Sequence, residues 1–213
     1  MAVLAPFLCK VLHMPKSATR IQQKNQAAIM AAGLEVSSQF GFRGSTLDQV
    51  AEAAGLSKPN LLYYFPSKEA IYNALLARLL ENWLEPLNQI DNAGDPVEEI
   101  LAYANRKLAM SRDFPRESRL FANEILQGAP RIKDVLAGEL RTLVQEKTTV
   151  IEGWIAEGKI RPVDPVHLIF SIWSLTQHYA DFDVQVRAIL GDADPFVSAA
   201  PHIDDIFRQL LTI

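Results

Sequence analysis

Apolar residues recur at intervals of three and four along almost the whole chain, whereas alternating runs of β-branched residues are missing. The first pattern is typical of helices with one buried face, and the second would indicate strands. The sequence therefore predicts an all-α fold. A first helix is expected over residues 19–40, with Gly41 and Gly44 ending it. Further long helices are expected over residues 67–90, 96–112, 116–127, 131–157, 165–190 and 201–212.

Signals for short helices crowd into the segment that follows the first helix. Thr46 followed by Gln49 is a capping-box pattern, in which the hydroxyl accepts a backbone N–H and the amide reaches back. Gly55 can adopt the left-handed conformation that ends a helix. Two residues later Ser57 can cap the next helix, with Pro59 tolerated in its first turn. The sequence thus predicts two short helices joined by about three residues.

Two helices with so short a linker must cross steeply and share a small core. The apolar residues placed to form it are Val50, Ala51, Ala54 and either Leu61 or Leu62. Together with the first helix, this arrangement predicts a three-helix head that contains a helix-turn-helix. The later helices are then expected to form a separate C-terminal bundle.

The second helix of a helix-turn-helix presents its first turn to the major groove of DNA. Here that turn contains Ser57, Lys58, Pro59 and Asn60. Lysine can donate to guanine or to a phosphate, asparagine can pair with adenine, and proline offers an apolar surface to a thymine methyl group. These residue types therefore predict contact with both bases and backbone.

Three further residues extend this candidate surface. Tyr63 and Tyr64 carry hydroxyls that can reach phosphate oxygens, and Lys68 lies near the start of the next helix, where the helix dipole also favours anions. The alternative for each tyrosine taken singly is an ordinary half-buried packing residue. As a set with Lys58 and Lys68, the two tyrosines favour DNA binding.

The charge distribution agrees with binding at one end of the chain. The formal net charge of −4 argues against a protein that coats nucleic acid unspecifically. Residues 15–70 contain six Lys or Arg against four Asp or Glu, whereas residues 71–213 contain fourteen against twenty-one. A mildly basic head on an acidic body is suited to binding a polyanion through the head alone.

The N-terminal end is expected to be a flexible tail over residues 1–15. Its apolar stretch is too short to span a bilayer and lacks a signal-peptide cleavage pattern. Met14, followed by polar residues, is an alternative start that would make residues 1–13 untranslated. The single cysteine, Cys9, permits neither a disulfide framework nor a cysteine metal site. These features favour a reducing compartment, the cytoplasm.

Catalysis is disfavoured, because the chain has no Gly-x-Ser-x-Gly motif, no phosphate loop and no metal tetrad. His178 and Asp181 have the spacing of a metal-ligand pair, but no third ligand stands out. A histidine at a helix–helix contact is the commoner case. The sequence therefore predicts no enzyme, no metal and no cofactor, and any turnover lost on changing Gln177 or His178 would reverse that view.

Residues 40–51 and 55–70, which read FGFRGSTLDQVA and GLSKPNLLYYFPSKEA, resemble the DNA-binding domain of the TetR family of bacterial repressors. The resemblance covers roughly residues 18–72. It implies that Thr46 and residues 58–64 contact operator DNA, that Lys68 contacts a phosphate, and that the protein is a homodimer. Arg43, inside the same stretch, joins these candidate DNA contacts.

In the body of the chain, one amide is out of place on an apolar helix face. Gln177 lies within a stripe formed by Val166, Ile169, Phe170, Trp173, Ala180 and Val184. An unpaired buried amide costs about 1 to 3 kcal/mol, so it must meet a protein partner or a ligand. Trp173, one turn earlier, offers a flat surface for stacking. Gln177 and Trp173 are therefore candidate ligand-binding residues.

Other polar and aromatic residues on apolar faces complete the candidate ligand site. Tyr103, Lys107 and Ser111 share one face of their helix, and Trp83 lies among leucines on the long helix after the head. The same pocket could collect all of them. The alternative is that the tryptophans fill the core and that Gln177 is an amide satisfied inside the protein.

Residues 75–185 resemble a subfamily of the TetR regulators whose effectors are uracil and thymine, with HLIFSIWSLTQHYADF at residues 167–182 the closest stretch. The resemblance implies a planar pyrimidine effector that releases the operator, and dimerisation through the C-terminal helices. It divides the chain into a head at residues 16–66 and a ligand-binding and dimerisation domain at residues 67–213. The alternative is a constitutive DNA-binding scaffold that recruits a protein partner.

Overall fold

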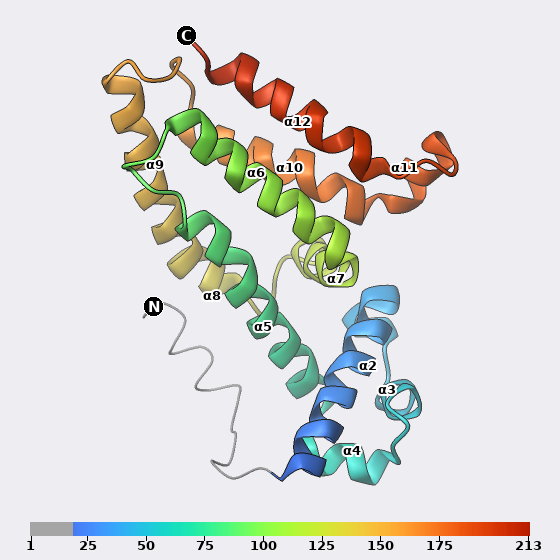
Figure 1. Cartoon of the computed structure of the whole chain (residues 1–213). Helices are drawn as coiled ribbons and strands as arrows, with labels where there is room; N and C mark the ends of the chain where they lie inside the picture. Colours follow the sequence, from blue (N-terminus) through green and yellow to red (C-terminus); the bar gives the residue numbers. More distant parts are fainter. Residues whose placement is uncertain (1–18) are drawn as a thin grey trace. The chain divides into compact units, whose positions relative to one another are not determined.

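The computed structural model describes residues 19–213, and the regular elements in this range are all helical (Figure 1). The expected all-α fold class is confirmed. The predicted tail at residues 1–15, the alternative start at Met14 and Cys9 lie outside the described residues. Within residues 19–213, no helix is both long enough and apolar enough to cross a membrane.

The described chain forms two compact units. The first contains residues 19–82 and 119–134, and the second contains Trp83–Ser118 and Val135–Ile213. Helices α2 (Arg20–Gly44), α3 (Leu47–Ala53) and α4 (Lys58–Tyr64) belong to the first unit. Helix α5 (Lys68–Asn88) begins in the first unit and ends in the second, and α7 (Pro115–Leu126) begins in the second and ends in the first. The predicted functional boundary at residues 66 and 67 stays a prediction.

The second unit contains α6 (Pro96–Asp113), α9 (Arg141–Ala156), α10 (Pro165–Asp181), α11 (Asp183–Leu190) and α12 (Pro195–Leu211). Three of these helices begin in the same way. Asp95, Asp164 and Asp194 each accept a backbone N–H of the following turn, and a proline stands at the first helical position. Proline loses nothing there, because that N–H has no partner within the helix.

The expected start of the last helix at residue 201 is wrong by six residues. Helix α12 begins at Pro195 and contains Pro201 in its interior. The prediction took Gly191 to Pro195 as a separator, whereas Asp194 and Pro195 are a cap and first residue. Pro201 is exposed and lies in the interior of the helix, where proline removes the backbone hydrogen bond that residue 201 would donate to the oxygen of Val197.

Two other expected helices are interrupted. The predicted helix at 131–157 divides into a short α8 (Lys133–Val135), a π-helical turn η1 (Leu136–Leu140) and α9. The predicted helix at 165–190 divides at Phe182, whose backbone is not helical (φ −112°, ψ 28°). Its ring stacks on that of His178, with the centroids 5.0 Å apart. This contact accompanies the break between α10 and α11.

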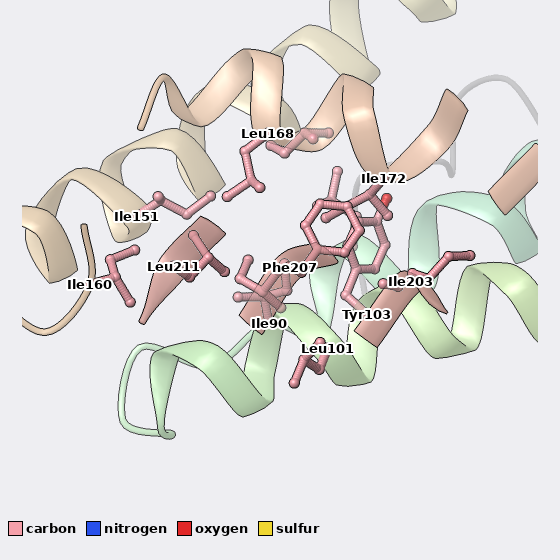
Figure 2. Close-up of a cluster of buried hydrophobic side chains, with 14 of the residues drawn as sticks. Ile90, Leu101, Tyr103, Ile151, Ile160, Leu168, Ile172, Ile203, Phe207 and Leu211 are labelled. Carbon is pink, nitrogen blue, oxygen red and sulfur yellow. The ribbon is translucent and has the colours of Figure 1, made fainter. Parts of the chain in front are cut away.

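The core of the second unit lies among α6, α9, α10 and α12 (Figure 2). Trp154 is fully buried, and its indole N–H donates to the backbone oxygen of Asn92. Aliphatic residues from all four helices surround Tyr103 and Phe207. This packing holds α6 and α10 against each other, and most of the candidate effector residues lie on these two helices.

Candidate DNA interface and effector site

The corner between α2 and α3 depends on a glycine. Gly41 has φ +65° and ψ 180°, so the regular helix ends there, as predicted. The chain then leads through Arg43, which is exposed, to Ser45, which is buried. Thr46 is the N-cap of α3, and the predicted capping box is confirmed. The Thr46 hydroxyl accepts from the Gln49 backbone N–H at 3.2 Å, and the Thr46 N–H donates to Gln49 Oε1 at 2.8 Å.

The turn between α3 and α4 also forms as expected. Gly55 has φ +66°, and Ser57 Oγ accepts from the Asn60 backbone N–H at 3.4 Å. Leu61 is fully buried, whereas Leu62 is 38% exposed. Of the two leucines that the sequence left open, Leu61 is therefore the core residue. Val50, 2% exposed, is buried on α3. The helix-turn-helix predicted from the sequence is confirmed.

The first turn of α4 presents polar side chains to solvent. Ser57, Lys58, Pro59 and Asn60 are all exposed. Lys58 Nζ lies 3.0 Å from Asp48 Oδ2, with 46% and 72% of the two side chains exposed. An exposed pair of this kind contributes less than about 1 kcal/mol, so a phosphate or a base can readily displace Asp48. The contact of these four residues with a major groove stays a prediction.

The two tyrosines connect α4 to α2. Tyr63 is 71% exposed and accepts from Gln22 Nε2 at 3.4 Å, while the half-buried Tyr64 accepts from Asn25 Nδ2 at 3.0 Å. Each hydroxyl still has its own hydrogen to donate. The structure therefore brings both residues next to the exposed turn of α4, and their contact with phosphates stays a prediction.

Lys68 has a role that the sequence did not indicate. Its ammonium donates to the backbone oxygens of Phe42 at 2.6 Å and of Ser45 at 2.7 Å, and lies 4.3 Å from the centre of the Phe42 ring. Two of its three N–H groups therefore close the corner between α2 and α3. One N–H remains for the predicted phosphate contact.

The candidate effector residues of α6 and α10 form two facing rows. Tyr103, Lys107 and Ser111 recur at every fourth position of α6 and are 1%, 4% and 2% exposed. On α10, Trp173 and Gln177 have the same spacing, and both are half-buried. The two helices pack together, and Trp173 Nε1 donates to the Tyr103 hydroxyl at 2.6 Å. The structure thus brings these residues into one region of the second unit.

Lys107 is the most unusual of these residues. Its ammonium lies 4.1 Å from the centre of the Trp83 ring, and burial lowers the pKa of Lys107 to about 8, although the charge of Asp181 opposes this shift. Ser111 Oγ donates to the Lys107 backbone oxygen at 3.2 Å. No residue in the described range accepts a hydrogen bond from the ammonium. Lys107 is therefore a buried cation with donors to spare.

Asp181 is a site residue that sequence reasoning missed. In the sequence, Asp181 stood out only through its metal-ligand spacing to His178, yet its carboxylate accepts from the buried Ser118 hydroxyl and is the acid whose charge acts on Lys107. His178 is exposed and stacks on Phe182. The residues that the structure covers contain no cluster of three or more metal-ligating side chains. The signal for Asp181 was its position one helical turn after Gln177.

The Gln177 side chain has no hydrogen-bond partner among residues 19–213. It lies on α10 between Trp173, which contacts Tyr103, and Asp181, whose charge acts on Lys107. Because Gln177 is half-buried and makes no hydrogen bond within this range, its role as a ligand contact stays a prediction. An amide offers one acceptor and two N–H donors, and here all of them are left for a ligand or for water.

Two family models match the chain. The model described as "Bacterial regulatory proteins, tetR family" matches residues 29–75, and the model described as "YcdC-like protein, C-terminal region" matches residues 76–212. The HTH-type transcriptional regulator RutR of Escherichia coli strain K12 is 51% identical over 173 residues, which are 81% of this chain and 82% of that protein.

Solved structures have the same fold at low identity. A bacterial regulatory protein in the tetR family from Rhodococcus RHA1 has a TM-score of 0.71 and 18% identity, covering 91% of this chain and 98% of that one. AibR in complex with isovaleryl coenzyme A and operator DNA has a TM-score of 0.67 and 18% identity, covering 87% and 97%. These likenesses confirm the fold.

Proposed function

The chain belongs to the TetR family of bacterial transcriptional regulators, and we propose that it represses as a homodimer released from its operator by a pyrimidine, uracil or thymine. In this proposal Arg43, Thr46, Tyr63, Tyr64, Lys68 and the first turn of α4 contact DNA. The effector binds among Trp83, Tyr103, Lys107, Ser111, Trp173 and Gln177. The protein would act in the bacterial cytoplasm and would not be an enzyme, in keeping with the regulator names of its relatives.

The observation that carries the effector proposal is the unpaired amide of Gln177 beside Trp173. A pyrimidine such as uracil has adjacent N–H and C=O groups at its ring edge, and one carboxamide can meet such a pair with its own acceptor and donor. The Trp173 indole provides a surface for the planar ring. The Lys107 ammonium can donate to a second carbonyl oxygen. A small ring with several acceptors and donors therefore fits these residues better than an acyl chain does.

Homodimerisation is supported by the exposed apolar side chains of the last helices. Large apolar residues are rarely left exposed in numbers on a monomer, and where they gather they mark an interaction surface. Helices α10, α11 and α12 carry six of them, Phe170, Val184, Ile189, Leu190, Val197 and Leu210, and Phe182 lies between α10 and α11. We assign the dimer contact to these helices.

Release of the operator requires that the effector bind one conformation more tightly than the other, since only differential affinity shifts the equilibrium. Helix α5 begins directly after the helix-turn-helix and contains Trp83 near its end. A ligand that rests against Trp83 therefore acts on a helix that is continuous with the DNA-binding unit. A coupling of about 100-fold corresponds to about 2.7 kcal/mol.

Calorimetry with uracil, thymine and adenine tests the effector. We expect the two pyrimidines to bind and adenine not to bind. Because the pKa of Lys107 is about 8, this group is partly neutral at pH 8, and a carbonyl that accepts from the ammonium would raise the pKa. Uracil binding at pH 8 should therefore take up about half a proton from the buffer, and affinity should fall as the pH rises through 8.

The proton uptake is measured as a change of the binding heat between phosphate and Tris buffers. The dependence should vanish at pH 6.5, where Lys107 is already charged, and in Lys107→Met at any pH. Absence of heat with both pyrimidines would contradict the effector proposal and favour the constitutive scaffold. If uracil bound at pH 8 with the same heat in both buffers, Lys107 would not be in contact with the ligand.

A further inference from the structure

The DNA-binding unit contains a segment far from the helix-turn-helix in sequence. Residues 119–134, which include most of α7, fold with residues 19–82 in the first compact unit. This segment contains Glu124, which is only 1% exposed. A carboxylate is rarely buried to this extent unless it is paired and hydrogen-bonded. The partner of Glu124 therefore indicates what the segment does.

That partner is Arg131. Its backbone N–H donates to Glu124 Oε1 at 2.9 Å, and its Nη1 donates to Glu124 Oε2 at 3.2 Å, so both carboxylate oxygens are satisfied. The intervening turn contains Gly128 with φ +87° and Ala129 with φ +53°. A left-handed alanine is uncommon and persists where surrounding contacts impose it. The turn thus places Arg131 next to Glu124. The flat face of the guanidinium remains able to contact other residues.

The guanidinium lies against the corner of the helix-turn-helix. Its Cζ is 3.6 Å from the centre of the Phe42 ring and 5.1 Å from that of Tyr72, and Nε is 3.8 Å from Glu69 Oε1. Phe42 also packs edge-on to Tyr72, with centroids 5.1 Å apart. Arginine stacks on aromatic rings in this way because its planar cation is weakly hydrated. Arg131 therefore connects a buried carboxylate to Phe42.

Phe42 occupies the position that orients α3. It directly follows Gly41, where the backbone of α2 is not helical, and its backbone oxygen accepts from Lys68. The same lysine holds the backbone oxygen of Ser45, the residue before the cap of α3. Arg131 thus contacts the corner through the Phe42 ring, and Lys68 contacts it through the backbone oxygens of Phe42 and Ser45. The direction of α3, and through the Gly55 turn that of α4, depends on this corner.

We propose that Arg131, held by Glu124, is a positioning residue for operator binding that does not itself touch DNA. The inference rests on the proposed DNA-binding function and adds a residue from outside the helix-turn-helix to it. The side chain of Arg131 is 15% exposed, its Nη1 donates to Glu124, and its Nε lies 3.8 Å from Glu69 Oε1. Replacing Arg131 should therefore remove no side chain that contacts DNA. It should instead make the corner between α2 and α3 less rigid, and with it the orientation of α3 and α4.

The test compares variants on a duplex that the wild-type protein selects from a random-sequence pool. Arg131→Met removes the stack but leaves Glu124 unpaired and buried, so the double variant Glu124→Gln with Arg131→Met removes that charge as well. Arg131→Lys keeps the charge and loses the planar stack. Lys133→Met, at an exposed residue two positions later, is the control for loss of one positive charge.

Fluorescence anisotropy is measured over a range of salt concentrations. We expect at least a tenfold loss of affinity in the double variant and in Arg131→Lys, and little change in Lys133→Met. The slope of log affinity against log salt should be the same in these three variants and in the wild-type protein. Hydrogen exchange should become faster in α3 and α4 while residues 20–40 of α2 stay protected. An unchanged slope matters because each lost phosphate contact would reduce it by about one.

Three results would overturn the inference. Wild-type affinity in the double variant would show that the corner needs no Arg131. A slope shallower by about one would make Arg131 a direct phosphate contact. Faster exchange throughout the first unit would make its role one of general stability. Failure of the wild-type protein to select any duplex would contradict the proposed function itself, and the inference with it.

Discussion

Replacing Lys58 by methionine and Asn60 by alanine together is expected to lower operator affinity by about 100-fold or more. A good side-chain contact to a base contributes about 1 to 3 kcal/mol, and 1.4 kcal/mol corresponds to a factor of ten. Both side chains are exposed, and the backbone N–H of Asn60 that Ser57 caps is retained in the variant. The loss should therefore come from missing DNA contacts and not from unfolding.

The two single variants should differ in kind. Lys58→Met should weaken binding to all duplexes and reduce the salt slope by about one if the ammonium contacts a phosphate. Asn60→Ala should change the order of affinities among duplexes that differ at one base pair. The matched control is Lys159→Met in the second unit, because Lys159 is 48% exposed and pairs with Glu157 at 2.7 Å, much as Lys58 pairs with Asp48. Equal affinities for the double variant and the control would contradict the interface.

Replacing Gln177 by methionine is expected to lower uracil affinity by about 10- to 100-fold without lowering the melting temperature. Methionine has nearly the same length but neither donor nor acceptor, so the pyrimidine would leave its own polar groups unpaired on binding, at about 1 to 3 kcal/mol. The free protein loses no hydrogen bond, because the Gln177 amide has no partner in the described range. A purely structural amide would behave in the opposite way.

The control for Gln177 is its neighbour Thr176. Its hydroxyl is fully buried and donates to the backbone oxygen of Ile172 at 2.7 Å, so Thr176→Val removes a polar group that the protein itself satisfies. We expect this variant to lose some stability and to bind uracil normally. Calorimetry and thermal unfolding of both variants measure the two effects. Undiminished uracil affinity in Gln177→Met would remove this residue from the effector site.

Local features of the fold could be predicted from the sequence, because their signals lie within a few residues. Thr46 with Gln49, Gly55 and Ser57 each predicted a cap or a turn that the structure contains. The same reasoning failed at the start of α12, where Asp194 and Pro195 were taken as a separator. It also missed the break at Phe182. A helical periodicity continues across such a break, so the hydrophobic pattern alone cannot reveal it.

Contacts between distant residues could not be predicted, and they change the roles of several site residues. Lys68 was expected at a phosphate, yet it bonds to carbonyls 23 and 26 positions earlier in the chain. The charge of Asp181 acts on Lys107, which is on another helix. Arg131 stacks on Phe42 from a segment that no motif indicated. Residue type predicted which side chains are chemically able to act, but their partners depend on the packing of helices.

Operator binding with and without uracil tests most directly whether this regulator senses a pyrimidine. The wild-type protein is titrated against the labelled duplex that it selects, first alone and then with saturating uracil, at one salt concentration. We expect a dissociation constant at least tenfold higher with uracil, and no such rise in Gln177→Met at the same uracil concentration. The same dissociation constant for the wild-type protein under both conditions would contradict this expectation.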